Sequence, residues 1–124
     1  MTPNQFRIGN LVKYDGKITT VTDVLCDSLN VMNCDHSILY EMIEPVEITE
    51  EVLIGMGCEF VEEYNSYTDK YRFQSVYLFF IKTTKTGVHF RYNKTQQYLP
   101  YAHQLQNLIF ALTGEEVTLN PELL

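Results

Sequence analysis

Residues 7–25 read RIGNLVKYDGKITTVTDVL. Asp15-Gly16 stands between two β-rich runs, and this dipeptide suits a two-residue turn whose central positions need positive φ. The stretch therefore predicts a β-hairpin. Further short strands are expected over 29–32 and 37–42, and several short strands in close succession favour a small curled barrel of the SH3-like kind.

A second lobe is predicted after Glu44-Pro45. Thr49 suits the N-cap of a short helix, and Gly57 is placed to end that helix in a left-handed conformation. From Cys58 to Leu99 the pattern of β-formers and turn residues predicts an antiparallel meander. Its strands are expected near 58–64, 70–82 and 88–92.

A final helix is predicted over 101–113, because Pro100 suits its first turn and Gly114 its end. The apolar stripe of this helix should pack on the meander. Its members are Ala102, Leu105, Leu108, Ile109 and Leu112. The expected fold is α+β, with an SH3-like lobe over 1–47 and an α+β lobe over 48–124, or one continuous domain.

The composition is that of an ordinary globular chain, since 45% of its 124 residues are hydrophobic and 20% are charged. Three widely spaced cysteines, Cys26, Cys34 and Cys58, fit reduced thiols better than a disulfide framework. The apolar runs are too short to cross a bilayer, so no membrane partner is expected. These features together predict a cytoplasmic protein.

The net charge of −7 disfavours nucleic-acid binding, because phosphate contacts need a positive field. The charge is unevenly spread: residues 41–63 hold eight glutamates and no Lys or Arg, whereas 64–94 hold six basic residues and one aspartate. These stretches are either solvated faces of adjacent elements or a basic hairpin that meets an acidic partner.

The basic meander is the alternative candidate site, for nucleic acid. Its cations are Lys70, Arg72, Lys82, Lys85, Arg91 and Lys94. Cations and rings on one exposed face can bind a single strand. Along the predicted strand 70–82, however, the cations fall on even positions and Tyr71, Phe73 and Tyr77 on odd ones, so the cations should face solvent and the rings the core.

No catalytic, cofactor or metal site is predicted. The chain has no Gly-x-Ser-x-Gly elbow and no glycine-rich phosphate loop. Cys34-x-His36 is the one close pair of metal-ligand residue types, and a single pair lacks the spacing of a structural zinc site. The thiols are interpreted as small core residues and His36 as a turn residue.

One side of the final helix is the candidate protein-contact face. His103, Gln106 and Phe110 lie off the apolar stripe, and an exposed phenylalanine can anchor a partner. Alternatively, both sides of this helix are covered within the monomer. The expected function is a non-enzymatic interaction module that binds an unknown protein partner or itself.

Three segments share a resemblance to known sequences. They are residues 7–12, residues 45–60 with the helix start Ile48-Thr-Glu-Glu51, and YAHQLQNLIFALTGEE at 101–116. Together they resemble a family of small uncharacterised proteins of Bacteroides-type bacteria and their phages and mobile elements. This chain departs from the family at Val52, Gly55 and Gly57. The resemblance implies an accessory role in that genomic context, without an activity or functional residues.

Overall fold

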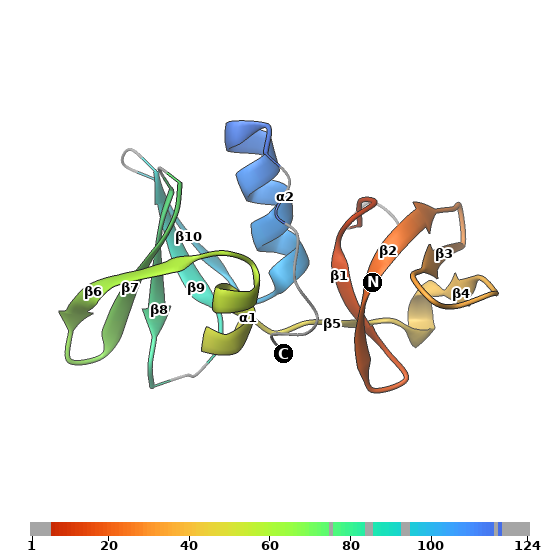
Figure 1. The fold of residues 1–124 in the computed structure, drawn as a ribbon, viewed down its shortest axis with the longest axis horizontal. Coiled ribbons are helices and arrows are strands. Elements are labelled where there is room, and N and C mark those ends of the chain that lie inside the picture. Colours follow the sequence, from red (N-terminus) through yellow and green to blue (C-terminus); the bar gives the residue numbers. More distant parts are fainter. Residues whose placement is uncertain (1–5, 75, 84–85, 93–94, 116, 118–124) are drawn as a thin grey trace. The chain divides into compact units, whose positions relative to one another are not determined.

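A computed structural model describes residues 6–74, 76–83, 86–92, 95–115 and 117. It contains two antiparallel sheets and a C-terminal helix (Figure 1), which confirms the α+β class. The chain forms two compact units. Of the described residues, the first unit joins those up to Val46 with 102–115, and the second joins Glu47–Tyr101 with Val117.

The sheet of the first unit has the strand order β4-β3-β2-β1-β5. Its strands are β1 (Leu11–Tyr14), β2 (Lys17–Val24), β3 (Ser28–Val31), β4 (Ile38–Leu39) and β5 (Glu44–Pro45), with a 3-10 helix over Tyr40–Met42. The predicted hairpin is confirmed, because Tyr14 pairs with Lys17 across Asp15 and Gly16, which have φ values of 52° and 77°.

The core of this unit gathers side chains from β1 to β4 and from the segments beside them. Its buried members are Phe6, Val12, Val21, Leu29, Val31, Ile38, Tyr40 and Ile43. Among the described residues no strand pairing joins the two edges of the sheet, β4 and β5. The closed SH3-like barrel is therefore not found, and that part of the fold stays a prediction.

The C-terminal helix α2 (Ala102–Thr113) matches the predicted range and ends at Gly114, whose φ is 73°. It groups with the first unit, and its expected packing on the meander stays a prediction. The buried side of α2 includes the polar residues His103 and Gln106, while Leu112 is 39% exposed. The predicted stripe is buried at Ala102, Leu105 and Ile109, and the hydrogen bond from Leu11 N to Gln106 adds a polar contact with β1 on the buried side.

The second unit begins with the helix α1 (Glu50–Gly55). Thr49 caps it as predicted, since its hydroxyl oxygen accepts a hydrogen bond from Val52 N at 3.3 Å. Gly57 follows with a φ of 89°. A five-stranded meander completes the unit, with β6 (Glu59–Asn65), β7 (Thr68–Phe73), β8 (Val76–Ile81), β9 (Val88–Tyr92) and β10 (Thr95–Leu99).

The predicted strand over 70–82 is wrong, because it is a hairpin of two strands. β7 and β8 pair with Phe73 opposite Val76, and Gln74 in the turn has a φ of 53°. This turn pairs odd positions of β7 with even positions of β8, so that Tyr71 lies opposite Leu78 and Arg72 opposite Tyr77. Side chains that point outward therefore have even numbers in β7 and odd numbers in β8.

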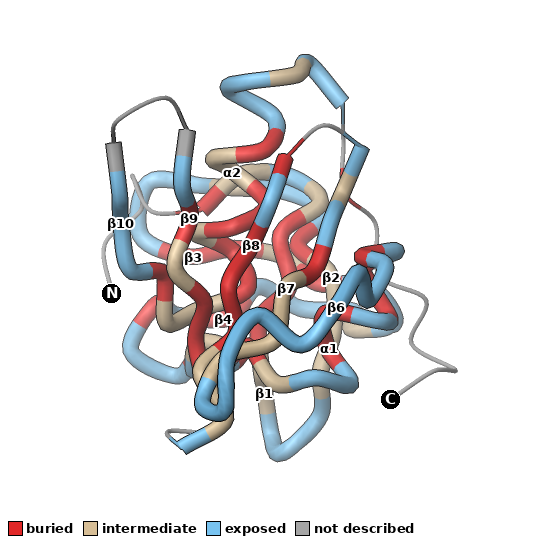
Figure 2. The backbone as a smooth tube through the Cα atoms, turned by 90° about the vertical axis from the view of Figure 1, so that its left-hand side faces the viewer, coloured by how far each residue is buried: buried red, intermediate tan, exposed pale blue. Residues whose placement is uncertain are grey.

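The meander has an inner and an outer face, because residues directly opposite each other share one face of a sheet. The inner face is buried and apolar, with Tyr71, Leu78, Phe80, Val88, Phe90 and Leu99. The outer face carries Lys70, Arg72, Tyr77, Phe79, His89, Arg91, Gln96 and Tyr98. Figure 2 shows the central strand β8 largely buried and the edge strand β6 exposed along its length.

Candidate functional site

The predicted contact face on α2 is built into the first unit instead of lying open to a partner. His103 and Gln106 are each only 2% exposed. The imidazole of His103 lies 5.0 Å from the ring of Phe6, and burial lowers its pKa to about 4. Gln106 Oε1 accepts from Leu11 N at 2.8 Å, and Gln106 Nε2 donates to Gly9 O at 3.0 Å. Gln106 therefore holds α2 to the start of β1, and His103 packs against Phe6 before that strand.

Phe110, the third residue of that predicted face, is 37% exposed. The guanidinium of Arg7 lies 3.9 Å from the centre of its ring, which is a close cation–π contact. Arg7 Nη1 also donates to Asn107 Oδ1 at 3.2 Å. Arg7 therefore covers one side of the ring, which favours the alternative that both sides of α2 are occupied within the chain.

The outer face of the meander brings rings and cations together. Lys70 Nζ lies 4.4 Å from the centre of the Tyr77 ring, and the Arg91 guanidinium lies 4.7 Å from the Phe79 ring. The rings of His89 and Tyr98 are 5.1 Å apart. The exposed fractions of Tyr77 and Tyr98 are 39% and 46%, so both rings are available to a ligand.

A shallow pocket opens in this face, with a volume of about 130 Å³. Phe79 and Arg91 line it together with Tyr64, whose ring meets the Phe79 ring edge-on at 5.0 Å. Polar groups at its rim include Asn65 and Gln96. An aromatic floor with a polar rim suits a flat or apolar group of a ligand.

Carboxylates offset much of the positive charge of this region. Arg72 donates to Glu59 Oε2 at 2.9 Å, and this bond raises the pKa of the guanidinium. Lys82 Nζ lies 3.5 Å from Asp69 Oδ1 and 3.7 Å from Glu63 Oε1. Of the six predicted cations, the outer face holds Lys70, Arg72 and Arg91, Lys82 follows β8, and Lys85 and Lys94 lie outside the described residues.

The sequence interpretation of the meander missed this arrangement because it overlooked the turn at Gln74. Even positions of β7 point outward, as expected for Lys70 and Arg72. After the turn it is the odd positions of β8 that point outward, which places Tyr77 beside Arg72 and Phe79 beside Lys70. The one available signal was the polar pair Gln74-Ser75, which is weak without Gly, Asn or Asp.

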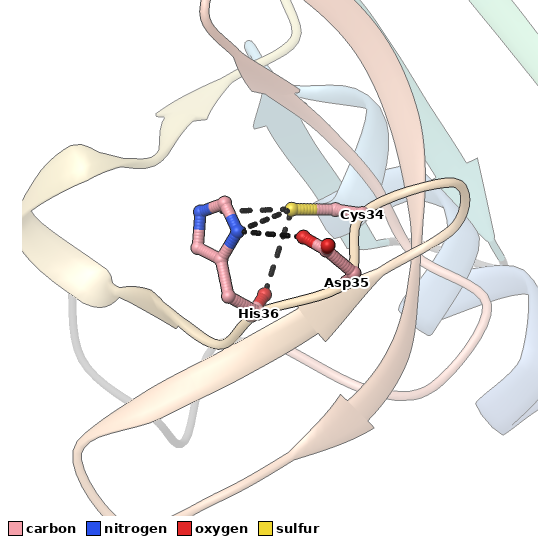
Figure 3. A group of neighbouring side chains, drawn as sticks. All are labelled: Cys34, Asp35 and His36. Carbon is pink, nitrogen blue, oxygen red and sulfur yellow. Dashed lines mark hydrogen bonds and ion pairs between the residues drawn. The ribbon is translucent and has the colours of Figure 1, made fainter.

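A second cluster lies in the loop between β3 and β4 of the first unit, where Cys34, Asp35 and His36 converge (Figure 3). Cys34 Sγ is 3.6 Å from His36 Nδ1, and the same nitrogen is 3.1 Å from Asp35 Oδ1. The hydrogen bond with His36 lowers the pKa of Asp35.

The three thiols occupy different environments. Cys58 is buried, and burial raises its pKa to about 12, so it stays protonated and unreactive at neutral pH. It alone fits the prediction of a buried core thiol. Cys34 is half-buried against the core of the first unit, and Cys26 is exposed.

Within the described residues, no helix combines the length and the apolar character needed to span a membrane. Comparisons with protein-family models, with curated proteins and with solved structures find no match for this chain. The resemblance to small proteins of Bacteroides-type bacteria and their phages therefore stays a prediction.

Proposed function

We propose that this chain is a non-enzymatic recognition protein that binds a protein partner through the outer face of its meander. The observation that carries this proposal is the exposure of Tyr77 and Tyr98 beside Arg91 on one face of a sheet. Tyrosine and arginine are enriched in protein interfaces and among the residues that dominate binding energy. An accessory role in a phage or mobile element, which the resemblance implies, is compatible with such a function.

The balance of charge favours a protein over a polyanion. Glu59 is bonded to Arg72, and Glu62 lies opposite Lys70 in the strand pairing. A polyanionic ligand would have to compete with these carboxylates, and the whole chain has a net charge of −7. A protein partner with its own mixed charges meets no such barrier.

The edge strand β6 is a poorer site for a partner, although all seven of its residues are exposed. Its pairing with β7 shifts register twice, between Phe60 and Glu62 and between Glu63 and Asn65. Bulges and charged residues on an edge oppose the addition of another strand. The proposed partner therefore binds side chains of the outer face and does not extend the sheet.

Site-specific photocrosslinking in the native host tests this proposal. A photoreactive phenylalanine derivative placed at Tyr77 or Tyr98 should yield a discrete adduct that protease removes. The matched control is Tyr67, which is 65% exposed in the β6–β7 turn of the same unit and lies off the outer face. Equal adducts from Tyr67, or none from Tyr77 and Tyr98, would count against the proposal.

Single-stranded nucleic acid is the second candidate ligand. The observation that favours it is that cations and rings share the outer face, as they do on surfaces that stack bases and contact phosphates. Labelled oligo(dT) and oligo(U) should then bind at low salt and weaken steeply as salt rises. Arg91→Gln should weaken this binding, whereas Lys17→Gln, at an exposed residue of the first unit, should not. If nucleic acid is the ligand, nuclease and not protease would remove the photocrosslinked adducts from position 77.

A further inference from the structure

The β3–β4 loop folds so that three metal-ligand residues in a row point toward one another. Cys34 N donates to Val31 O at 3.4 Å, and Asn33 between them has a φ of 64°, a conformation that asparagine tolerates well. The tight turn directs the thiol, the carboxylate and the imidazole into one space (Figure 3). Their ligand atoms all lie within 4.8 Å of one another.

Two of the three distances among these atoms are close to the edges of a tetrahedral zinc site. Zinc bonds of about 2.3 Å to sulfur and about 2.0 Å to nitrogen or oxygen give edges of about 3.5 Å for S···N and about 3.3 Å for N···O. The observed separations are 3.6 Å from Cys34 Sγ to His36 Nδ1 and 3.1 Å from His36 Nδ1 to Asp35 Oδ1. The thiol and a carboxylate oxygen of Asp35 lie within 4.8 Å, so side-chain rotations must bring them to about 3.5 Å for one ion to bind all three groups.

We infer that Cys34, Asp35 and His36 form a binding site for a zinc ion, with a fourth position left open. One thiolate, one imidazole and one carboxylate suit zinc, whereas magnesium and calcium prefer oxygen ligands alone. When zinc binds, a zinc–sulfur bond replaces the S–H bond of Cys34, and the proton passes to solvent.

The three proposed ligands also line a polar pocket of about 290 Å³ in the same unit. Asp23 and Asn30 line it beside the three proposed ligands, and Asn30 Nδ2 donates to Asp23 Oδ2 at 3.3 Å. The pocket is open to solvent, since Asp35 and His36 are exposed. Water or a carboxylate can therefore complete the coordination, as in zinc sites with three protein ligands.

This inference is independent of the proposed function, because the loop belongs to the first unit and the outer face to the second. It also revises the expectation from sequence. The pair Cys34-x-His36 alone offers two ligands, and the structure adds Asp35 as a third, with its Oδ1 atom 3.1 Å from His36 Nδ1.

Cobalt titration followed by zinc displacement tests the site on the intact, reduced chain. We expect thiolate-to-cobalt charge-transfer absorption that saturates at one equivalent and disappears when zinc is added. Cys34→Ser should abolish this absorption. His36→Gln and Asp35→Asn, at exposed positions where the fold is not at risk, should weaken cobalt binding by more than about tenfold.

Cys26→Ser is the matched control, because Cys26 is an exposed thiol outside the cluster. It should leave the cobalt spectrum and the zinc affinity unchanged. The inference is overturned if the wild-type chain shows no charge-transfer absorption, if Cys34→Ser retains it, or if Cys26→Ser removes it. Binding that is unaffected by His36→Gln would also overturn it.

Discussion

Gln106 Oε1 accepts a hydrogen bond from Leu11 N at 2.8 Å, although the two residues are 95 positions apart in the chain. The same carboxamide donates to Gly9 O through Nε2. Gln106 therefore satisfies the backbone N–H of Leu11, the first residue of β1, and the carbonyl of Gly9 just before it. One polar side chain thus links the C-terminal helix to the N-terminal sheet of the first unit.

Replacing Gln106 by leucine should destabilise the chain by about 2–4 kcal/mol, because the buried N–H of Leu11 and the half-buried carbonyl of Gly9 lose their partner. The urea midpoint measures the loss. Gln97→Leu is the control, since Gln97 is exposed on β10. A loss at Gln106 no larger than that at Gln97 would show that these hydrogen bonds contribute little.

His103 should make the stability of the chain depend on pH. Burial lowers its pKa in the folded state from 6.5 to about 4, so the folded chain binds fewer protons than the unfolded chain between these values. The free energy of unfolding is therefore not reduced by His103 above about pH 6.5. It falls by up to about 3 kcal/mol as the pH is lowered toward 4.

Urea titrations across this range of pH should therefore show a steeper loss of stability for the wild-type chain than for His103→Phe. Phenylalanine keeps an aromatic ring beside Phe6 and cannot take up a proton. The carboxylates titrate in both proteins, so the difference between the two curves isolates His103. Parallel curves would show that His103 is not the group responsible.

Gly87 should be required for the position of the Tyr98 ring. A methyl group at Gly87 would lie 2.5 Å from the Tyr98 hydroxyl oxygen, and Gly87 has a φ of 81°. Gly87→Ala should push the ring away from His89 and cost about 0.5–1 kcal/mol more than the backbone strain alone.

Gly16→Ala measures that strain separately, because Gly16 has a similar φ of 77° and open space around it. The chemical shifts of the His89 ring protons report the displacement, since the Tyr98 ring lies 5.1 Å away. Unchanged shifts in Gly87→Ala, together with equal costs for the two glycines, would contradict the predicted displacement.

The elements with strong local signals were predictable from the sequence. Asp15-Gly16, the cap at Thr49 and the left-handed Gly57 all act within a few residues, so their chemistry is visible in a short window. The packing of α2 was not predictable in this way. It depends on Gln106 meeting Leu11, a contact between distant segments that helical periodicity does not reveal.

The candidate site was predicted only in part, for a related reason. The alternation of Lys70, Tyr71 and Arg72 correctly gave the outward side of β7. The side chains of β8 were assigned to the wrong faces. The faces of the second strand of a hairpin can be deduced from those of the first only when the length of the turn is known. The arrangement of the outer face therefore depends on the turn at Gln74.

Gln74→Gly tests that turn directly. Gln74 has a φ of 53°, where a side chain is strained and glycine is not, so the substitution should stabilise the chain by up to about 1 kcal/mol. If residues 70–82 formed one continuous strand, glycine would instead weaken it by about 0.5–1 kcal/mol. Gln97→Gly, within the strand β10, provides the expected effect of glycine in a strand of the same sheet. If Gln74→Gly lost as much stability as Gln97→Gly, the result would contradict the hairpin and the strand pairing that places Tyr77 beside Arg72.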